Sequence, residues 1–181
     1  MPVTPLHYPL AKIIQTLDTK ARLSLPALIL GSLVPDLEVP LVYLWSGTWA
    51  QDRMVLHSLI GGLTLGTLIA VAFTVLVYPW LVSAFLPIDK KRVKEKCTFS
   101  FMLVFSALLG VLSHVLLDIF NHPYNPLFWP FLTLFQTPSP IVPLLGGQAT
   151  ASFIVHGGML LLFFLLLIKN RSNLWEKLFV G

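Results

Sequence analysis

Three stretches of about twenty apolar residues constrain this chain more than any other feature of its sequence. Leu59 to Tyr78 contains no charged side chain. Cys97 to Leu117 and Ala151 to Ile168 are free of charge apart from His114 and His156. A helix needs about 20 such residues to cross the hydrocarbon core of a bilayer. Each stretch therefore predicts a transmembrane helix.

A fourth stretch, Leu23 to Trp45, is apolar but interrupted by Pro35, Asp36, Glu38 and Pro40. A proline inside a helix removes one backbone hydrogen bond and kinks the helix. Broken helices occur within membranes where they line a cavity or pack against other protein segments. This stretch therefore predicts a broken first span.

Composition excludes the soluble classes of protein. Charged residues make up 11% of the 181 residues and hydrophobic residues 56%, whereas a soluble domain is about 25% charged. We therefore expect an all-α, polytopic membrane bundle that forms a single domain over residues 1–181. The net charge of +4 would suggest nucleic acid in a soluble protein, but here we expect no nucleic-acid partner. Cys97 is the only cysteine, which rules out an internal disulfide and a multi-cysteine metal site.

The basic residues predict the orientation of the four spans. Eleven of the 12 lysines and arginines precede the first span, follow the last, or lie between the second and third. They are Lys12, Lys20, Arg22, Lys90, Lys91, Arg92, Lys94, Lys96, Lys169, Arg171 and Lys177. Arg53 alone falls in a loop on the other side. By the positive-inside rule, both termini should be cytoplasmic in a multi-pass protein of a prokaryotic cell membrane.

The remaining segments should be loops or surface helices. Pro5 to Thr19 has apolar residues at helical spacing and predicts a short amphipathic or half-inserted helix. Asn121 to Pro143 is rich in proline and aromatic residues, which favours the outer interface of the membrane. The basic run from Lys90 to Lys96 predicts a solvated loop facing the lipid headgroups. The N-terminus has neither a basic nor a contiguous apolar region, so we expect no cleavable signal peptide.

This topology gathers the ionisable side chains of the spans in the outer half of the bilayer. His57 opens the second span at its outer end, and the third span runs outward to Asp118. His114, Asp118 and His122 are spaced i, i+4 and i+8, so they share one helical face. Asp36 lies in the middle or outer half of the first span. His7 reaches the same depth if the N-terminal helix pairs antiparallel with the first span.

A metal ion is the interpretation that best explains acids at this depth. A membrane-embedded aspartate costs roughly 2.5–3.5 kcal/mol on insertion scales and needs a partner. No lysine or arginine is expected near Asp36 or Asp118, so a divalent cation held by carboxylate and imidazole would supply the charge. A single histidine in a membrane more often forms an interhelical hydrogen bond. That alternative suits His156 and also applies to His7, and Glu38 fits a solvated or capping position.

Four separated motifs carry a resemblance to a known family. They are Met1-Pro-Val-Thr-Pro-Leu-His7, Gly31-Ser-Leu-Val-Pro-Asp36-Leu-Glu38, His57-Ser-Leu-Ile-Gly61 and Ser113-His-Val-Leu-Leu-Asp118-Ile-Phe-Asn-His122. In this order they resemble an uncharacterised prokaryotic integral-membrane family that is grouped with the membrane-bound metal-dependent hydrolases. The resemblance covers most of residues 1–125.

A remoter similarity is to the zinc-dependent phospholipases C and the related single-strand nucleases. Their ligand order of His, Asp, His, His-x-x-x-Asp and His is matched by His7, Asp36, His57, His114, Asp118 and His122. Their last motif, His-x-x-x-Glu, is not matched, because Leu160 stands four residues after His156. This similarity implies one zinc site formed by Asp36, His57, His114 and Asp118, and a second that His7 and His122 complete.

These resemblances imply a hydrolase that acts on a lipid or lipid-linked phosphate ester. Asp118 would hold the metal and tune its bound water, and Glu38 is a candidate general base. Two other classes of function remain open. A transporter of metal ions or protons would use the same residues as a transient site. A non-catalytic scaffold would use the metal only to hold its helices together.

Overall fold

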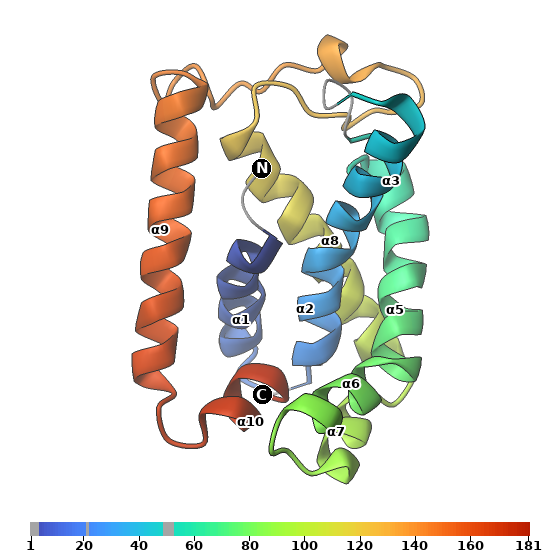
Figure 1. The fold of residues 1–181 in the computed structure, drawn as a ribbon, viewed down its shortest axis with the longest axis vertical. Coiled ribbons are helices and arrows are strands. Elements are labelled where there is room, and N and C mark those ends of the chain that lie inside the picture. Colours follow the sequence, from blue (N-terminus) through green and yellow to red (C-terminus); the bar gives the residue numbers. More distant parts are fainter. Residues whose placement is uncertain (1–3, 21, 49–52) are drawn as a thin grey trace.

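The computed structural model describes residues 4–20, 22–48 and 53–181, and the chain forms a bundle of helices (Figure 1). Four helices are long and apolar enough to span a membrane: Leu25–Ser46, Leu59–Leu76, Phe101–Asn121 and Gln148–Lys169. The four predicted spans and the all-α fold are confirmed. Within the described residues the only β-type pairing is an isolated bridge between Tyr124 and Pro138.

The first span is broken where the sequence predicts. It consists of α2 (Leu25–Leu33), the 3₁₀ turn η2 (Val34–Leu37) and α3 (Glu38–Ser46). The Ser24 side chain caps α2 by accepting a hydrogen bond from the backbone N–H of Ala27. Pro35 lies in η2, where its missing N–H prevents a regular α-helical bond.

The N-terminal segment is the predicted short helix. It comprises the 3₁₀ turn η1 (Thr4–His7) and α1 (Tyr8–Leu17). Figure 1 shows α1 lying beside α2, between α2 and the last span. Residues 1–3 of the first sequence motif lie outside the described residues.

The second span begins with α4 (Leu59–Gly61), continues through a π-helical turn, η4 (Gly62–Gly66), and ends with α5 (Thr67–Leu76). It is followed by α6 (Tyr78–Phe85) and α7 (Lys90–Lys96). The prediction of a loop at Lys90–Lys96 is wrong. Asp89 caps α7 by accepting from the Lys91 N–H, and Val93 is fully buried against the bundle, so the basic run has an apolar anchor.

The third span, α8 (Phe101–Asn121), packs most closely against α2. A Cβ placed on Gly31 would lie 2.2 Å from the carbonyl oxygen of Ala107, and one on Gly110 would lie 2.4 Å from that of Leu28. Such separations are closer than any carbon–oxygen contact allows. The two helices therefore cross through glycine, with their backbones touching. This crossing fixes the position of α8 relative to the broken span.

The fourth span, α9 (Gln148–Lys169), stands at one side of the bundle and is largely exposed to the surroundings (Figure 1). The short α10 (Leu174–Phe179) then folds back beneath α1 and beside α6. Three side chains hold its backbone carbonyls: the Tyr8 hydroxyl donates to Leu178, the Lys12 ammonium to Lys177, and the Tyr78 hydroxyl to Phe179. These bonds tie the first helix to the last.

The segment between α8 and α9 is irregular apart from the 3₁₀ turn η5 (Leu134–Gln136). It crosses the end of the bundle opposite α6, α7 and α10 (Figure 1). Phe128, Phe131 and Phe135 are exposed on it. The predicted aromatic loop is present, and its place at the outer membrane interface stays a prediction.

Candidate metal centre

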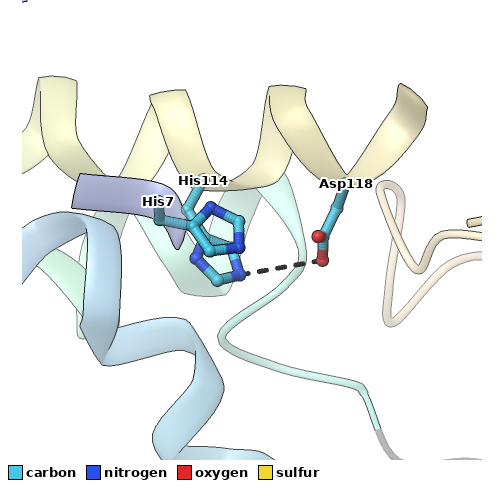
Figure 2. A group of neighbouring side chains, drawn as sticks. All are labelled: His7, His114 and Asp118. Carbon is cyan, nitrogen blue, oxygen red and sulfur yellow. Dashed lines mark ion pairs between the residues drawn. The ribbon is translucent and has the colours of Figure 1, made fainter. Parts of the chain in front are cut away.

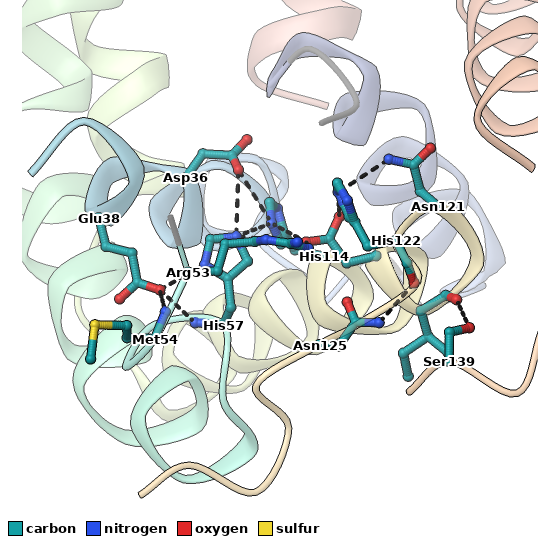
Figure 3. Close-up of polar contacts among 12 residues, drawn as sticks. Asp36, Glu38, Arg53, Met54, His57, His114, Asn121, His122, Asn125 and Ser139 are labelled. Atoms are coloured by element: carbon teal, nitrogen blue, oxygen red, sulfur yellow. Dashed lines mark hydrogen bonds and ion pairs between the residues drawn. The ribbon is translucent and has the colours of Figure 1, made fainter. Parts of the chain in front are cut away.

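Five ionisable side chains from four separate segments meet inside the bundle (Figures 2 and 3). His7 ends η1, Asp36 lies in η2, His57 lies just before α4, and His114 and Asp118 lie one turn apart on α8. All five are at most 8% exposed, and His114 is fully buried. Burial of several titratable groups at one point requires a compensating charge or a full set of hydrogen bonds.

His114 is oriented by the break in the first span. Its Nδ1 lies 2.7 Å from the carbonyl oxygen of Ser32. In a 3₁₀ turn that carbonyl would accept from the residue three positions later, which is Pro35 and has no N–H. The Ser32 carbonyl is thus available to His114. Because a carbonyl can only accept, Nδ1 carries the proton and the Nε2 lone pair faces the other members of the cluster.

His57 is oriented in the same way by Glu38. Its Nδ1 lies 2.8 Å from Glu38 Oε1, and the two Glu38 oxygens also accept backbone N–H bonds from Met54 and Leu56 at 2.7 Å each. Glu38 is only 6% exposed, so the expectation of a solvated position is wrong, whereas the backbone N–H bonds that it accepts agree with the alternative of a capping position. Its carboxylate holds the segment before α4 and the tautomer of His57 at once. Occupied oxygens favour this positioning role over that of a general base.

The two Nε2 atoms that face the centre of the cluster lie close together. His57 Nε2 and His114 Nε2 are 3.3 Å apart. Asp36 Oδ1 lies 3.6 Å from the first and 3.5 Å from the second, and Asp118 Oδ2 lies 3.6 Å and 3.7 Å from them. Two lone pairs and two carboxylate oxygens therefore face a common point. Neutral imidazoles of this tautomer have no proton to place between them, so a cation is needed there.

Burial alone would lower the pKa of His57, but the carboxylates around it raise that pKa to about 9. A proton on Nε2 is thus one way to supply the positive charge. A metal ion at the same point is the other, and it would displace that proton. The remaining oxygens, Asp36 Oδ2 and Asp118 Oδ1, are buried without a hydrogen-bond partner among the described residues.

His7 joins the cluster by lying against the ring of His114 (Figure 2). The two rings stack with centroids 3.8 Å apart and an interplanar angle of 14°. His7, His114 and Asp118 form one group in which one ligand atom from each residue lies within 4.8 Å of the others, and Asp36, His57 and His114 form another. Neither nitrogen of His7 has a hydrogen-bond partner in the described part of the chain. Burial lowers its pKa to about 3, which keeps it in the neutral form that binds metals.

Two further histidines lie outside both groups of possible ligands: His122, which the sequence predicts as a ligand, and His156. His122 caps the C-terminal end of α8, where its Nε2 lies 3.1 Å from Asn121 Nδ2 and 3.6 Å from Asp118 Oδ1. An amide N–H directed at Nε2 occupies the lone pair that a metal would need. His156 lies on α9, and its Nδ1 is 2.6 Å from the carbonyl oxygen of Ser152 in the same helix.

The expectation that no basic residue reaches this depth is wrong. The guanidinium Nη1 of Arg53 lies 3.9 Å from Asp118 Oδ2, and the side chain is buried (Figure 3). In the sequence, Arg53 stands out only as the one basic residue that the charge pattern assigns to the outer side of the membrane. Its charge offsets one of the three carboxylates of Asp36, Glu38 and Asp118, which still leaves a deficit of two when the histidines are neutral.

Comparison with known proteins gives one match. The family model described as YdjM inner membrane protein matches residues 8–179, a range that contains every residue of the cluster except His7. Neither a curated protein nor a solved structure matches the chain.

Proposed function

Because the chain belongs to the YdjM inner membrane protein family, we propose for it a function within the bilayer, as a membrane-embedded metal-dependent hydrolase. The cluster of Asp36, His57, His114 and Asp118 holds a divalent metal ion of the zinc type. The substrate is a lipid or lipid-linked phosphate ester. Four apolar helices and the family support a multi-pass membrane protein, and the charge pattern supports cytoplasmic termini with the site on the outer side.

One observation carries the metal proposal. The Nε2 atoms of His57 and His114 and the Oδ1 of Asp36 form a triangle with sides of 3.3, 3.5 and 3.6 Å. A tetrahedral zinc ion with bonds of about 2.0–2.2 Å keeps its ligand atoms about 3.3–3.6 Å apart. The triangle is thus one face of such a tetrahedron, formed by two imidazoles whose tautomers are already fixed. Asp118 Oδ2, near the same two nitrogens, supplies the fourth ligand, and His7 adds a second group that shares His114 and Asp118.

The surroundings of His7 support a lipid as the substrate. An open apolar groove of about 580 Å³ lies between Leu6 on η1 and residues Ser152 to Leu160 of α9. α9 is a membrane span, so acyl chains surround this groove. Leu6 is next to His7 in the chain, so a chain seated in the groove would bring its headgroup toward the cluster.

The chemistry follows from the charge of the ion. A bound zinc-type ion lowers the pKa of a water toward 7 and polarises a phosphoryl oxygen. The protein keeps His114 and His57 in the ligating tautomer through Ser32 and Glu38. Hydrogen-bonded partners of this kind typically change metal affinity or activity about 10–100-fold.

A structural metal is the second candidate, and the deep burial of the four ligands favours it. A closed tetrahedral site holds helices together, whereas a catalytic site keeps a position for water. The binding free energy of a structural metal is part of the folding free energy. Removal of the ion therefore separates the two functions.

The test combines metal analysis with an activity screen. Purified protein should contain at least one metal ion per chain, and His114→Ala and Asp118→Asn should lose it. His156→Ala is the matched control and should retain the ion. Hydrolysis of lipid phosphates that is lost on chelation, with the melting temperature nearly unchanged, supports the hydrolase. A protein that unfolds on chelation and hydrolyses none of the lipid phosphates beforehand is a metal-held scaffold. A wild-type protein that binds no divalent metal refutes both.

A further inference from the structure

Arg53 is an exception to the charge pattern of the chain, and its side chain is buried. It is the one basic residue in a segment between the first and second spans, and its side chain is only 7% exposed. Figure 3 shows the side chain extending from that segment toward His114, and its Nη1 lies 3.9 Å from Asp118 Oδ2. A buried guanidinium is costly unless anions surround it. The membrane topology does not account for a buried arginine at the edge of the cluster, whereas a ligand that its charge binds would.

The same side chain lines a second, more enclosed pocket. This pocket has a volume of about 90 Å³ and lies between residues 53–54 and the irregular segment after α8, where Pro126, Trp129, Thr133 and Leu134 complete its wall. Such a volume holds several water molecules, each of which takes about 30 Å³ in the liquid. It is therefore of the size of a small anion and too small for a lipid tail. Among the described residues that line this pocket, Arg53 pairs with Asp118.

An arginine is suited to one class of ligand in this position. Its planar guanidinium matches the oxygens of a phosphate in a two-pronged arrangement, and it stays charged when buried. Among the described residues that line the pocket, none is acidic. An anion bound in it would share the guanidinium of Arg53 with the carboxylate of Asp118.

We propose that the pocket lined by Arg53, Trp129 and Thr133 binds the phosphate group of the substrate, with Arg53 as the residue that recognises its charge. This inference deepens the proposed function and rests on it, because the bound phosphate belongs to a substrate only if the protein is a hydrolase. The binding of phosphate itself does not depend on catalysis. The phosphate is carried by a lipid headgroup or is free in solution, and both present the same oxygens to Arg53.

The experiment measures the affinity of the purified full-length protein for inorganic phosphate by calorimetry, with zinc bound and after chelation. Arg53→Met should weaken binding about tenfold or more, since hydrogen bonds to charged groups contribute that much. Arg53→Lys keeps the charge without the planar fork and should lose less. Arg92→Met is the matched control, because Arg92 is exposed and pairs with Glu176 at the opposite end of the bundle; its affinity should equal that of the wild type.

Zinc content and melting temperature are measured on the same samples. Equal phosphate affinity in the wild type and in both Arg53 variants, or no phosphate binding by the wild type, overturns the proposal. If Arg53→Met fails to fold, Arg53→Lys alone decides. Arg53-dependent phosphate binding in a protein that binds no metal would support the phosphate pocket and refute the hydrolase proposal. Metal binding without Arg53-dependent phosphate binding would refute the phosphate pocket and leave the metal proposal standing.

Nanodiscs identify the source of the phosphate. Phosphatidic acid in a phosphatidylcholine disc should compete with inorganic phosphate if the pocket accepts a lipid headgroup. Unchanged phosphate affinity relative to discs of phosphatidylcholine alone assigns the pocket to free phosphate. Either result supports the pocket and names its ligand.

Discussion

Gly31 and Gly110 face each other where α2 crosses α8, and a Cβ on Gly110 would come within 2.9 Å of the Cα of Gly31. The next residue after Gly31 is Ser32, whose carbonyl orients His114, and His114 lies one turn after Gly110 on α8. This close backbone contact thus lies beside the hydrogen bond that orients the metal-facing nitrogen of His114. Packing and site geometry depend on the same crossing.

We therefore predict that Gly110→Ala and Gly31→Ala each destabilise the protein by about 1–3 kcal/mol, the usual cost of overpacking. Thermal or denaturant unfolding in detergent would measure it. Gly66→Ala is the matched control, since a Cβ there meets its nearest neighbours at 3.8 Å, an ordinary contact. A Gly110→Ala protein as stable as Gly66→Ala would show that the helices can separate without loss.

Glu38→Gln should weaken metal binding without abolishing it. The amide cannot accept all the N–H bonds that the carboxylate takes from Met54, Leu56 and His57, so the ring of His57 loses its fixed tautomer. The expected loss of zinc affinity is about 10–100-fold. Competition with a metal chelator measures it, and Glu176→Gln, at a half-buried site on α10 that pairs with Arg92, supplies the control. Unchanged affinity would remove Glu38 from any positioning role.

The groove along α9 offers a matched pair of glycines. Gly157 lines the groove, whereas its neighbour Gly158 does not, and a Cβ on either meets nothing within 4 Å. Gly157→Leu should fill the groove and raise the KM for a lipid phosphate with long acyl chains, leaving a short-chain analogue less affected. Gly158→Leu should leave both substrates unchanged. If the two variants behave alike, acyl chains do not use the groove.

Cys97 permits a direct test of orientation. It is 2% exposed, and burial raises its pKa to about 12 from an ordinary value of 9. The reactive thiolate is therefore scarce at pH 8, and native Cys97 should not react with an impermeant maleimide. The sign also predicts that stability falls as the pH rises from about 9 to 12, because only the unfolded thiol loses its proton in that window.

Single cysteines can then be added without removing Cys97. A cysteine at Ser46 or Leu144 should react from outside the cell, and one at Lys91 or Ser172 only after permeabilisation. Ser46 and Leu144 are both exposed. Reaction of the Lys91 position from outside would reverse the orientation.

The sequence was informative wherever a single helix decides the outcome. The absence of charge located the spans, Pro35 located the break, and the i, i+4 spacing placed His114 and Asp118 on one face. It failed where the path of a loop decides. The segment before α4 turns back into the bundle, which brings Arg53 to Asp118 and the backbone N–H groups of Met54 and Leu56 to Glu38. No periodicity encodes such a return, since it depends on contacts between distant segments.

The broken first span has a consequence for biogenesis. Of the four spans it is the least hydropathic, and each acid it carries disfavours its transfer from the translocon into lipid. The partners of Glu38 emerge from the ribosome 16 to 19 residues later, but His114, which faces Asp36, follows only with the third span. Until then Asp36 has only one of its two imidazole partners, His57. We expect its final placement in the bilayer to wait for α8, so that the bundle assembles in an order different from that of its synthesis.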